Sequence, residues 1–371
     1  MTFENILQNI DLAQLRDSIY AVSERDVKNI LKKKHFSITD LPVLISHAAA
    51  PFLEKMSVIA QQTTFLRFGK TVKLYAPLYV SNECVNECAY CGFNKNNEIE
   101  RITLKKEDVF KEADALYIQG FRHILLVSGE DRDKVSVSFL ADIVRELSRK
   151  FAAVSIEVYP MDVADYNRLV LSGVTGIALY QETYHRDIYR TLHKGPKADF
   201  NYRLSTHERA GVAGFRELGI AALIGLADFR VDMACVALHA RYLMKRFWET
   251  QVAVSFPRLR FAAGGFRPPV NVSDRELAQA VFALRLVLPD VDLVLSTREK
   301  PEFRDGMAGV GITRISAGSK TNPGGYALVD NSLEQFQVAD SRTPAEVASM
   351  LDSKGLEPVW KDFDPHFLND S

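Results

Sequence analysis

"VKLYAPLYVSNECVNECAYCGF", residues 72–93, joins a strand-like run to three closely spaced cysteines. Residues 72–81 are rich in β-branched and aromatic side chains, as a buried strand would be, and Cys84, Cys88 and Cys91 follow almost at once. The 371-residue chain contains only one other cysteine, Cys235. The fold that the sequence predicts therefore depends on whether similar strands follow further along the chain.

Seven more strand-like runs follow the first. They span residues 123–129, 154–160, 176–183, 219–226, 252–259, 292–298 and 312–320. Segments with helical periodicity separate them, and one begins with a capping box formed by Ser273 and Glu276. Apolar strands that alternate with helices predict a parallel sheet covered on both faces. Eight such units favour a closed (β/α)8 TIM-type barrel of the α/β class over an open doubly wound sheet.

The barrel is expected to have an addition at each end. We predict an N-terminal helical extension over 1–70, the barrel over 71–325, and a C-terminal segment packed on the barrel over 326–371. Helix start signals stand at Ser23 and Thr39 in the first segment. A last helix should begin at Thr343, which forms a capping box with Glu346, and end near Gly355.

The composition indicates a globular protein with reduced thiols. The chain is 47% hydrophobic and 25% charged, with a net charge of −1. This balance argues against nucleic acid as a partner, since such proteins usually carry a basic face. The N-terminus does not resemble a secretory signal and no run has the length of a membrane span, so we expect a cytoplasmic protein without a membrane partner. Clustered cysteines there bind metal or do redox chemistry more often than they form disulfides.

Three thiolates without a fourth narrow the choice of metal group. A structural zinc site needs four ligands, usually as two pairs, so zinc would require a distant histidine here. A [4Fe-4S] cluster normally takes four thiolates. Three thiolates would leave one iron open to a substrate or cofactor.

The cysteine spacing, three residues and then two, with an aromatic residue before the last cysteine, resembles the radical S-adenosylmethionine (SAM) superfamily. The resemblance implies that Cys84, Cys88 and Cys91 hold a [4Fe-4S] cluster whose open iron binds SAM. A low-potential reductant such as flavodoxin or ferredoxin would supply the electron that cleaves SAM to a 5'-deoxyadenosyl radical. Tyr90 would lie against the adenine, although it could equally be an ordinary core aromatic residue.

The same resemblance implies further SAM-binding residues at the strand ends. Gly129 and Glu130 would hold the ammonium group of SAM, Glu157 its ribose hydroxyls, and Gly225 would bring backbone close to the adenine. Each residue also has a structural explanation. The "SGE" stretch at 128–130 could be a plain turn, Glu157 could pair with a barrel arginine, and Gly225 could be a turn glycine.

A closer resemblance rests on several stretches together. "YQETYH", "SFPRLR", "LSTRE", "SKTNPGGY" and "PVWKDFD", with the cysteine stretch, resemble the tyrosine lyases of thiamine biosynthesis, the 2-iminoacetate synthase (ThiH) family. This resemblance implies that the Cα–Cβ bond of L-tyrosine is cleaved to 2-iminoacetate (dehydroglycine) and p-cresol. SAM would become methionine and 5'-deoxyadenosine, and iminoacetate would pass to a thiazole synthase.

An amino-acid substrate brings a carboxylate into a site with little water. Arg298, at the end of the seventh strand, has the planar guanidinium that binds a carboxylate through two hydrogen bonds, and Ser296 and Thr297 could add hydroxyl donors. Arg298 could instead pair with Glu299. Other candidates are Arg258, Arg260, Tyr159, Gln181, Glu182, Ser316, Ser319 and Lys320.

Other polar residues and other functions remain open. We expect His185 and His193 to be surface residues or to lie behind the site, and Cys235 to be a buried apolar residue. A tyrosine lyase of hydrogenase maturation is the alternative enzyme, but no cysteine after Cys235 could hold its second cluster. A non-enzymatic Fe-S or zinc module is the alternative outside enzymes.

Overall fold

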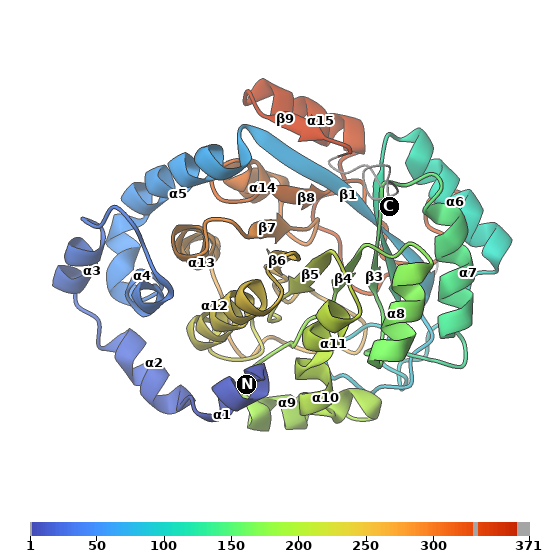
Figure 1. Cartoon of the computed structure of the whole chain (residues 1–371), viewed down its shortest axis with the longest axis horizontal. Helices are drawn as coiled ribbons and strands as arrows, with labels where there is room; N and C mark the ends of the chain where they lie inside the picture. The colour runs from blue at the N-terminus through green and yellow to red at the C-terminus, as the bar shows by residue number, and fades with distance from the viewer. Residues whose placement is uncertain (1, 329–332, 362–371) are drawn as a thin grey trace.

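Eight parallel strands close into a barrel in the computed structural model, which describes residues 2–328 and 333–361 (Figure 1). They are β1 (Thr71–Ser81), β2 (His123–Ser128), β3 (Ala153–Glu157), β4 (Gly176–Ala178), β5 (Glu217–Ile220), β6 (Gln251–Ser255), β7 (Asp292–Leu295) and β8 (Arg314–Ser316). Each strand pairs with the next, and β1 pairs with both β8 and β2. The predicted barrel and its eight strands are confirmed.

Helices surround the strands on the outside (Figure 1). They are α6 (Lys106–Ile118), α7 (Val137–Leu147), α8 (Val163–Leu171), α9 (Arg186–Leu192), η3 (Pro196–Ala198), α10 (Phe200–Leu204), α11 (Thr206–Val212), α12 (Phe229–Arg246), α13 (Asp274–Val287) and α14 (Pro301–Met307). The Ser273–Glu276 capping box starts α13 as predicted. Since the helices run antiparallel to the strands, their C-terminal ends lie at the N-terminal end of the barrel.

Residues 2–70 are mostly helical, and their helices lie outside α12 and α13 (Figure 1). They are α1 (Phe3–Gln8), α2 (Leu12–Tyr20), α3 (Glu24–Ile30), η1 (Ile38–Asp40), α4 (Leu41–Leu44), η2 (His47–Phe52) and α5 (Leu53–Phe68). Ser23 caps α3 as predicted. The start at Thr39 is wrong, because Ser37 precedes η1 and forms the capping box with Asp40.

No single helix in the described part of the chain is long and apolar enough to cross a membrane. One helix pair, Ile38–Leu44 with His47–Phe68, meets the length and composition criteria together, but it is bent by 88°.

The C-terminal segment returns to β1. Helix α15 (Pro344–Ser353) begins with the predicted Thr343–Glu346 capping box. A short strand that the sequence did not predict, β9 (Glu357–Val359), then pairs with residues 71–73 of β1. The predicted segment 326–371 includes 329–332 and 362–371, which lie outside the described residues. The exact boundaries of the three predicted segments stay predictions.

Candidate active site

The three clustered cysteines face a cavity of about 890 Å³ at the C-terminal end of the barrel. We call it the cysteine cavity. The loop that carries them is fixed by Arg101, whose guanidinium donates to the carbonyls of Asn82 (2.8 Å), Phe93 (3.0 Å) and Asn94 (2.7 Å). These bonds tie the start of the loop to its end.

The chemistry of the three thiols fits an iron-sulfur cluster. None of them is in a disulfide. Burial raises the pKa of each thiol, and the neighbouring thiols Cys84 and Cys91 raise that of Cys88 further. Three thiolates side by side therefore need a cationic group to balance them. Among the described residues, no three His, Cys, Asp or Glu side chains converge as a single metal ion would require, whereas a cubane cluster takes each thiolate on a different iron.

Two residues close to the cysteine loop come from distant parts of the sequence. Gly129 follows β2, and a Cβ atom there would lie only 2.1 Å from the carbonyl oxygen of Glu83. Gln335 donates from its side-chain nitrogen to the sulfur of Cys91 at 3.8 Å and accepts from the hydroxyl of Tyr79 at 2.8 Å. Nothing in the sequence around Gln335 had indicated this role.

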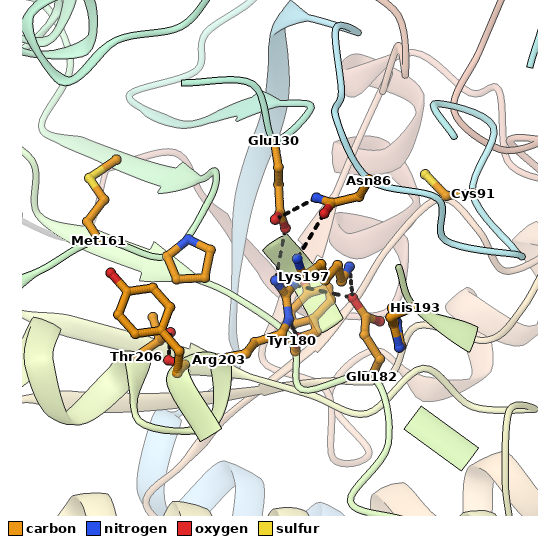
Figure 2. Close-up of polar contacts among 12 residues, drawn as sticks. Asn86, Cys91, Glu130, Met161, Tyr180, Glu182, His193, Lys197, Arg203 and Thr206 are labelled. Atoms are coloured by element: carbon orange, nitrogen blue, oxygen red, sulfur yellow. Dashed lines mark hydrogen bonds and ion pairs between the residues drawn. The ribbon is translucent and has the colours of Figure 1, made fainter. Parts of the chain in front are cut away.

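A buried charged cluster forms one wall of the cysteine cavity (Figure 2). Arg203 lies 2.9 Å from Glu130 and 3.4 Å from Glu182, and Lys197 lies 2.7 Å from Glu182. Asn86 donates to Glu130 at 3.0 Å and accepts from the backbone N–H of Lys197 at 2.8 Å. The cluster balances two carboxylates against two cations. Sequence analysis named the carboxylates but missed Lys197 and Arg203.

Glu182 has an unusual backbone conformation within this cluster. Its φ is 71°, and among the described residues it is the only non-glycine residue with positive φ. Burial favours the neutral carboxyl, but Lys197 and Arg203 outweigh this effect and lower the pKa of Glu182. A strained backbone at a buried ion pair is typical of a functional site.

Tyr90 lines the same cavity and is held from behind by His193. Its hydroxyl lies 2.7 Å from Nε2 of His193, and Nδ1 of His193 lies 2.7 Å from the carbonyl oxygen of Tyr189. Burial lowers the pKa of His193 to about 3, so the ring is neutral. It donates a hydrogen bond from Nδ1 to the Tyr189 carbonyl, and its Nε2 accepts a hydrogen bond from the Tyr90 hydroxyl. His193 is thus buried behind the site, one of its two expected positions.

A second cavity, of about 570 Å³, lies further along the barrel. We call it the central cavity. Its lining includes the candidates Ser296, Thr297, Ser316 and Ser319, and it shares Val127, Glu157, Tyr180, Pro257, Arg298 and Phe336 with the cysteine cavity. A molecule in one cavity can therefore contact a molecule in the other.

The Arg298 guanidinium is available to a ligand. It stacks on Phe336, with its central carbon 3.3 Å from the ring centroid. Within the described residues its side chain makes no hydrogen bond or ion pair, and the alternative pairing with Glu299 is wrong. The two competing arginines occupy Glu299 instead. Arg260 lies 2.6 Å from it, and Arg258 binds it together with Asp274 and the carbonyl oxygen of Val272.

Five candidates lie outside the linings of both cavities. Tyr159 donates its hydroxyl to the carbonyl oxygen of Val135 at 2.6 Å, which turns it away from the site. Gly225 lies beyond the end of β5, has a φ of 115° and behaves as a turn glycine. Gln181 is buried outside the cavity linings and Lys320 is exposed. Arg258 also lies outside the cavity linings, whereas Arg260 lines the cysteine cavity.

Glu157 lines both cavities. In the described part of the chain it makes no hydrogen bond or ion pair, so the expected alternative of a salt bridge is wrong. Burial raises the pKa of Glu157 to about 7, and Arg298 partly opposes this shift. The unsatisfied carboxylate points to a bound hydroxyl donor or cation.

Glu157→Gln should make the stability of the ligand-free protein less dependent on pH. A glutamate in the unfolded chain has a pKa of about 4.3. The folded protein therefore binds the carboxyl proton of Glu157 more tightly than the unfolded chain does. The contribution of Glu157 is therefore fully favourable at low pH and is lost as pH rises through about 7. Thermal unfolding at pH 5 and 7.5 measures the difference, with exposed Glu54→Gln as the control. If the stability of wild type and of Glu157→Gln depended on pH to the same extent, the raised pKa of Glu157 would be contradicted.

The similarity of the chain to known proteins points to the same kind of site. Residues 78–233 match the radical SAM superfamily and residues 255–357 match the biotin and thiamin synthesis associated domain. The chain is 44% identical to 2-iminoacetate synthase of Salmonella typhimurium, covering 98% of this chain and 97% of that protein. It is 42% identical to the Escherichia coli enzyme of the same name, covering 98% of this chain and 97% of that protein. The solved FeFe-hydrogenase maturase HydG of Carboxydothermus hydrogenoformans is 31% identical, with a TM-score of 0.88 over 97% of this chain and 85% of that one.

The higher identity to the synthases favours them over the hydrogenase-maturation alternative. The radical SAM match also implies a [4Fe-4S] cluster and SAM as cofactors. The chain belongs to the 2-iminoacetate synthase family of radical SAM lyases.

Proposed function

We propose that the protein cleaves the Cα–Cβ bond of L-tyrosine to 2-iminoacetate and p-cresol and hands iminoacetate to a thiazole synthase in the cytoplasm. The observation that carries this proposal is the arrangement of the two joined cavities. One is lined by the three thiols, and Arg298, which lines both, stacks on Phe336 and makes no side-chain hydrogen bond or ion pair within the described residues. A SAM-sized and a tyrosine-sized ligand would meet between them.

We propose that Cys84, Cys88 and Cys91 hold the cluster and that the charged wall around Glu130 binds the amino-acid end of SAM. A reduced cluster held by these thiolates would supply the electron for cleavage of SAM to methionine and a 5'-deoxyadenosyl radical. Glu130 is a carboxylate that faces the cavity and attracts an ammonium group. Tyr90 offers an apolar ring to the adenine, and Glu157 accepts hydrogen bonds from the ribose hydroxyls.

Arg298 would bind the tyrosine carboxylate through its two terminal nitrogens, aided by the hydroxyls of Ser296 and Thr297. Stacking on Phe336 keeps the guanidinium plane in one orientation. This contact would place the substrate amino group and Cα next to the shared lining of the two cavities. Hydrogen abstraction needs such near-contact of the reacting atoms.

Protein reconstituted without oxygen should convert L-tyrosine, given SAM and a low-potential reductant. We expect 5'-deoxyadenosine and p-cresol to appear together, with glyoxylate accumulating as iminoacetate hydrolyses. Liquid chromatography of the three products tests this. Sustained release of carbon monoxide would move the protein to the hydrogenase-maturation class, and SAM cleavage without p-cresol would refute tyrosine as the substrate.

A further inference from the structure

The backbone of Gln335 is held directly against the cysteine loop. Its N–H donates to the carbonyl of Thr321 at 2.9 Å, and the hydroxyl of Thr321 donates to the carbonyl of Phe336 at 3.2 Å. On the other side lies Gly92, which follows Cys91 in the sequence. A Cβ atom at Gly92 would lie only 2.5 Å from the carbonyl oxygen of Gln335. The two segments are therefore in backbone contact, which a larger residue at position 92 would prevent.

Residues 333–340, which carry Gln335, are also fixed at their far end. The backbone N–H groups of Ala339 and Asp340 donate to the carbonyl of Thr297 at 2.9 and 3.1 Å. The carboxylate of Asp340 pairs with the buried guanidinium of Arg304. Gln335 is half-buried and lines the cysteine cavity together with the three thiols. Its place beside the thiols is thus set by contacts on both sides.

Tyr79 sets the orientation of the Gln335 amide. Burial raises the pKa of Tyr79 well above its usual value, so the hydroxyl keeps its proton. It donates this proton in a hydrogen bond to Oε1 of Gln335 at 2.8 Å. Nε2 of the same amide then faces Sγ of Cys91 at 3.8 Å. The reverse orientation would bring the amide oxygen against a thiolate, and two acceptors repel each other.

The other hydrogen bonds to the clustered thiols come from the backbone. The N–H groups of Asn86 and Phe93 donate to the sulfurs of Cys84 and Cys91. Among the described residues, the side chain that hydrogen-bonds one of the three thiols is that of Gln335. The amide of Gln335 is therefore the donor that the choice of side chain determines.

We propose that Gln335, acting through the thiolate of Cys91, raises the reduction potential of the [4Fe-4S] cluster. This inference rests on the proposed cluster ligands but not on tyrosine as the substrate. One electron from flavodoxin or ferredoxin takes the cluster from the 2+ to the 1+ state, and no covalent bond forms or breaks. The added negative charge spreads onto the thiolate sulfurs. An N–H donor at a sulfur therefore stabilises the reduced state more than the oxidised state.

Gln335→Met tests this assignment, because methionine has a similar length and no N–H donor. The midpoint potential of protein reconstituted without oxygen is measured by redox titration, with electron paramagnetic resonance of the reduced cluster and without SAM or tyrosine. At a fixed potential, the ratio of reduced to oxidised cluster should be about threefold to tenfold lower than in wild type. A tenfold change corresponds to a midpoint about 59 mV lower for one electron.

Gln337→Met is the matched control, because it makes the same substitution at an exposed side chain two residues further on. It should keep the wild-type midpoint. Tyr79→Phe is a second test, because it keeps the Gln335 side chain and removes the bond that orients the amide. Its midpoint should fall in the same direction by a smaller amount. A wild-type midpoint in Gln335→Met would overturn the proposal. If Gln335→Met holds no cluster, a wild-type midpoint in Tyr79→Phe would overturn it.

Formation of 5'-deoxyadenosine separates electron supply from a merely structural role of Gln335. In Gln335→Met it should fall with flavodoxin as the reductant and recover with an excess of a stronger chemical reductant. If Gln335 only kept the loop in shape, product formation would stay slow with either reductant. Absence of the cluster from wild type, or its retention in Cys91→Ala, would instead refute the proposed cluster ligands.

Discussion

Replacing Cys84, Cys88 or Cys91 with alanine is expected to abolish the cluster and with it all cleavage of SAM. Wild-type protein reconstituted without oxygen should hold about four irons and four sulfides, as one cubane cluster does. With three ligands and one open iron, the loss of any thiolate leaves two irons without protein ligands. Iron and sulfide analysis, the brown absorbance and 5'-deoxyadenosine formation should all fall to background.

Cys235→Ala is the control for this prediction. Cys235 is fully buried on α12, away from the cysteine cavity, so its replacement should keep the cluster and SAM cleavage. It removes one small buried side chain, at a cost in stability of about 1 kcal/mol. Loss of the cluster in this variant, or its retention in any of the other three, would overturn the ligand assignment.

Arg298→Lys is expected to separate SAM cleavage from tyrosine cleavage. Lysine keeps the charge but loses the planar pair of donors, and loss of a buried charge-paired contact costs ~2 to 5 kcal/mol. Tyrosine binding should weaken by roughly 30-fold or more, since 1.4 kcal/mol corresponds to about tenfold. The cluster should remain, with slow 5'-deoxyadenosine formation that no longer yields an equal amount of p-cresol.

Arg260→Lys is the matched control, because Arg260 is already paired with Glu299. It should keep tyrosine affinity and the equal yields of 5'-deoxyadenosine and p-cresol. If Arg298→Lys behaves like wild type while Arg260→Lys or Arg258→Lys loses both properties, the carboxylate is bound by the residues that follow β6.

The strands were predictable because their side chains are buried on both faces, which leaves continuous apolar runs. The ends of the strands were harder to predict. The run 219–226 continues past β5, which ends at Ile220, because Ala222 and Ile224 form only isolated bridges in a loop. The apolar pattern marks burial, and these loop residues are buried as well.

The parts of the site that escaped prediction are those without local signals. Lys197 and Arg203 lie in and after η3, where basic residues usually face solvent, and only the fold brings them to Glu182 and Glu130. Gln335 contacts Cys91 although the two residues are 244 positions apart in the sequence. By contrast, the position of Arg298 beside the cavities could be predicted, because it lies three residues after β7 at the end of the barrel where active sites form.

The pairing of β1 bears on when the cofactor can be inserted. The cysteines directly follow β1, which can pair early with β2, but the barrel closes only when β1 also pairs with β8, which begins at Arg314. A ribosome therefore makes over 200 further residues after Cys91 before β1 has a neighbour on both sides. At ~5 to 20 residues per second, this leaves the thiols without a finished barrel for tens of seconds. Iron-sulfur assembly on this protein is thus expected to follow release of the complete chain.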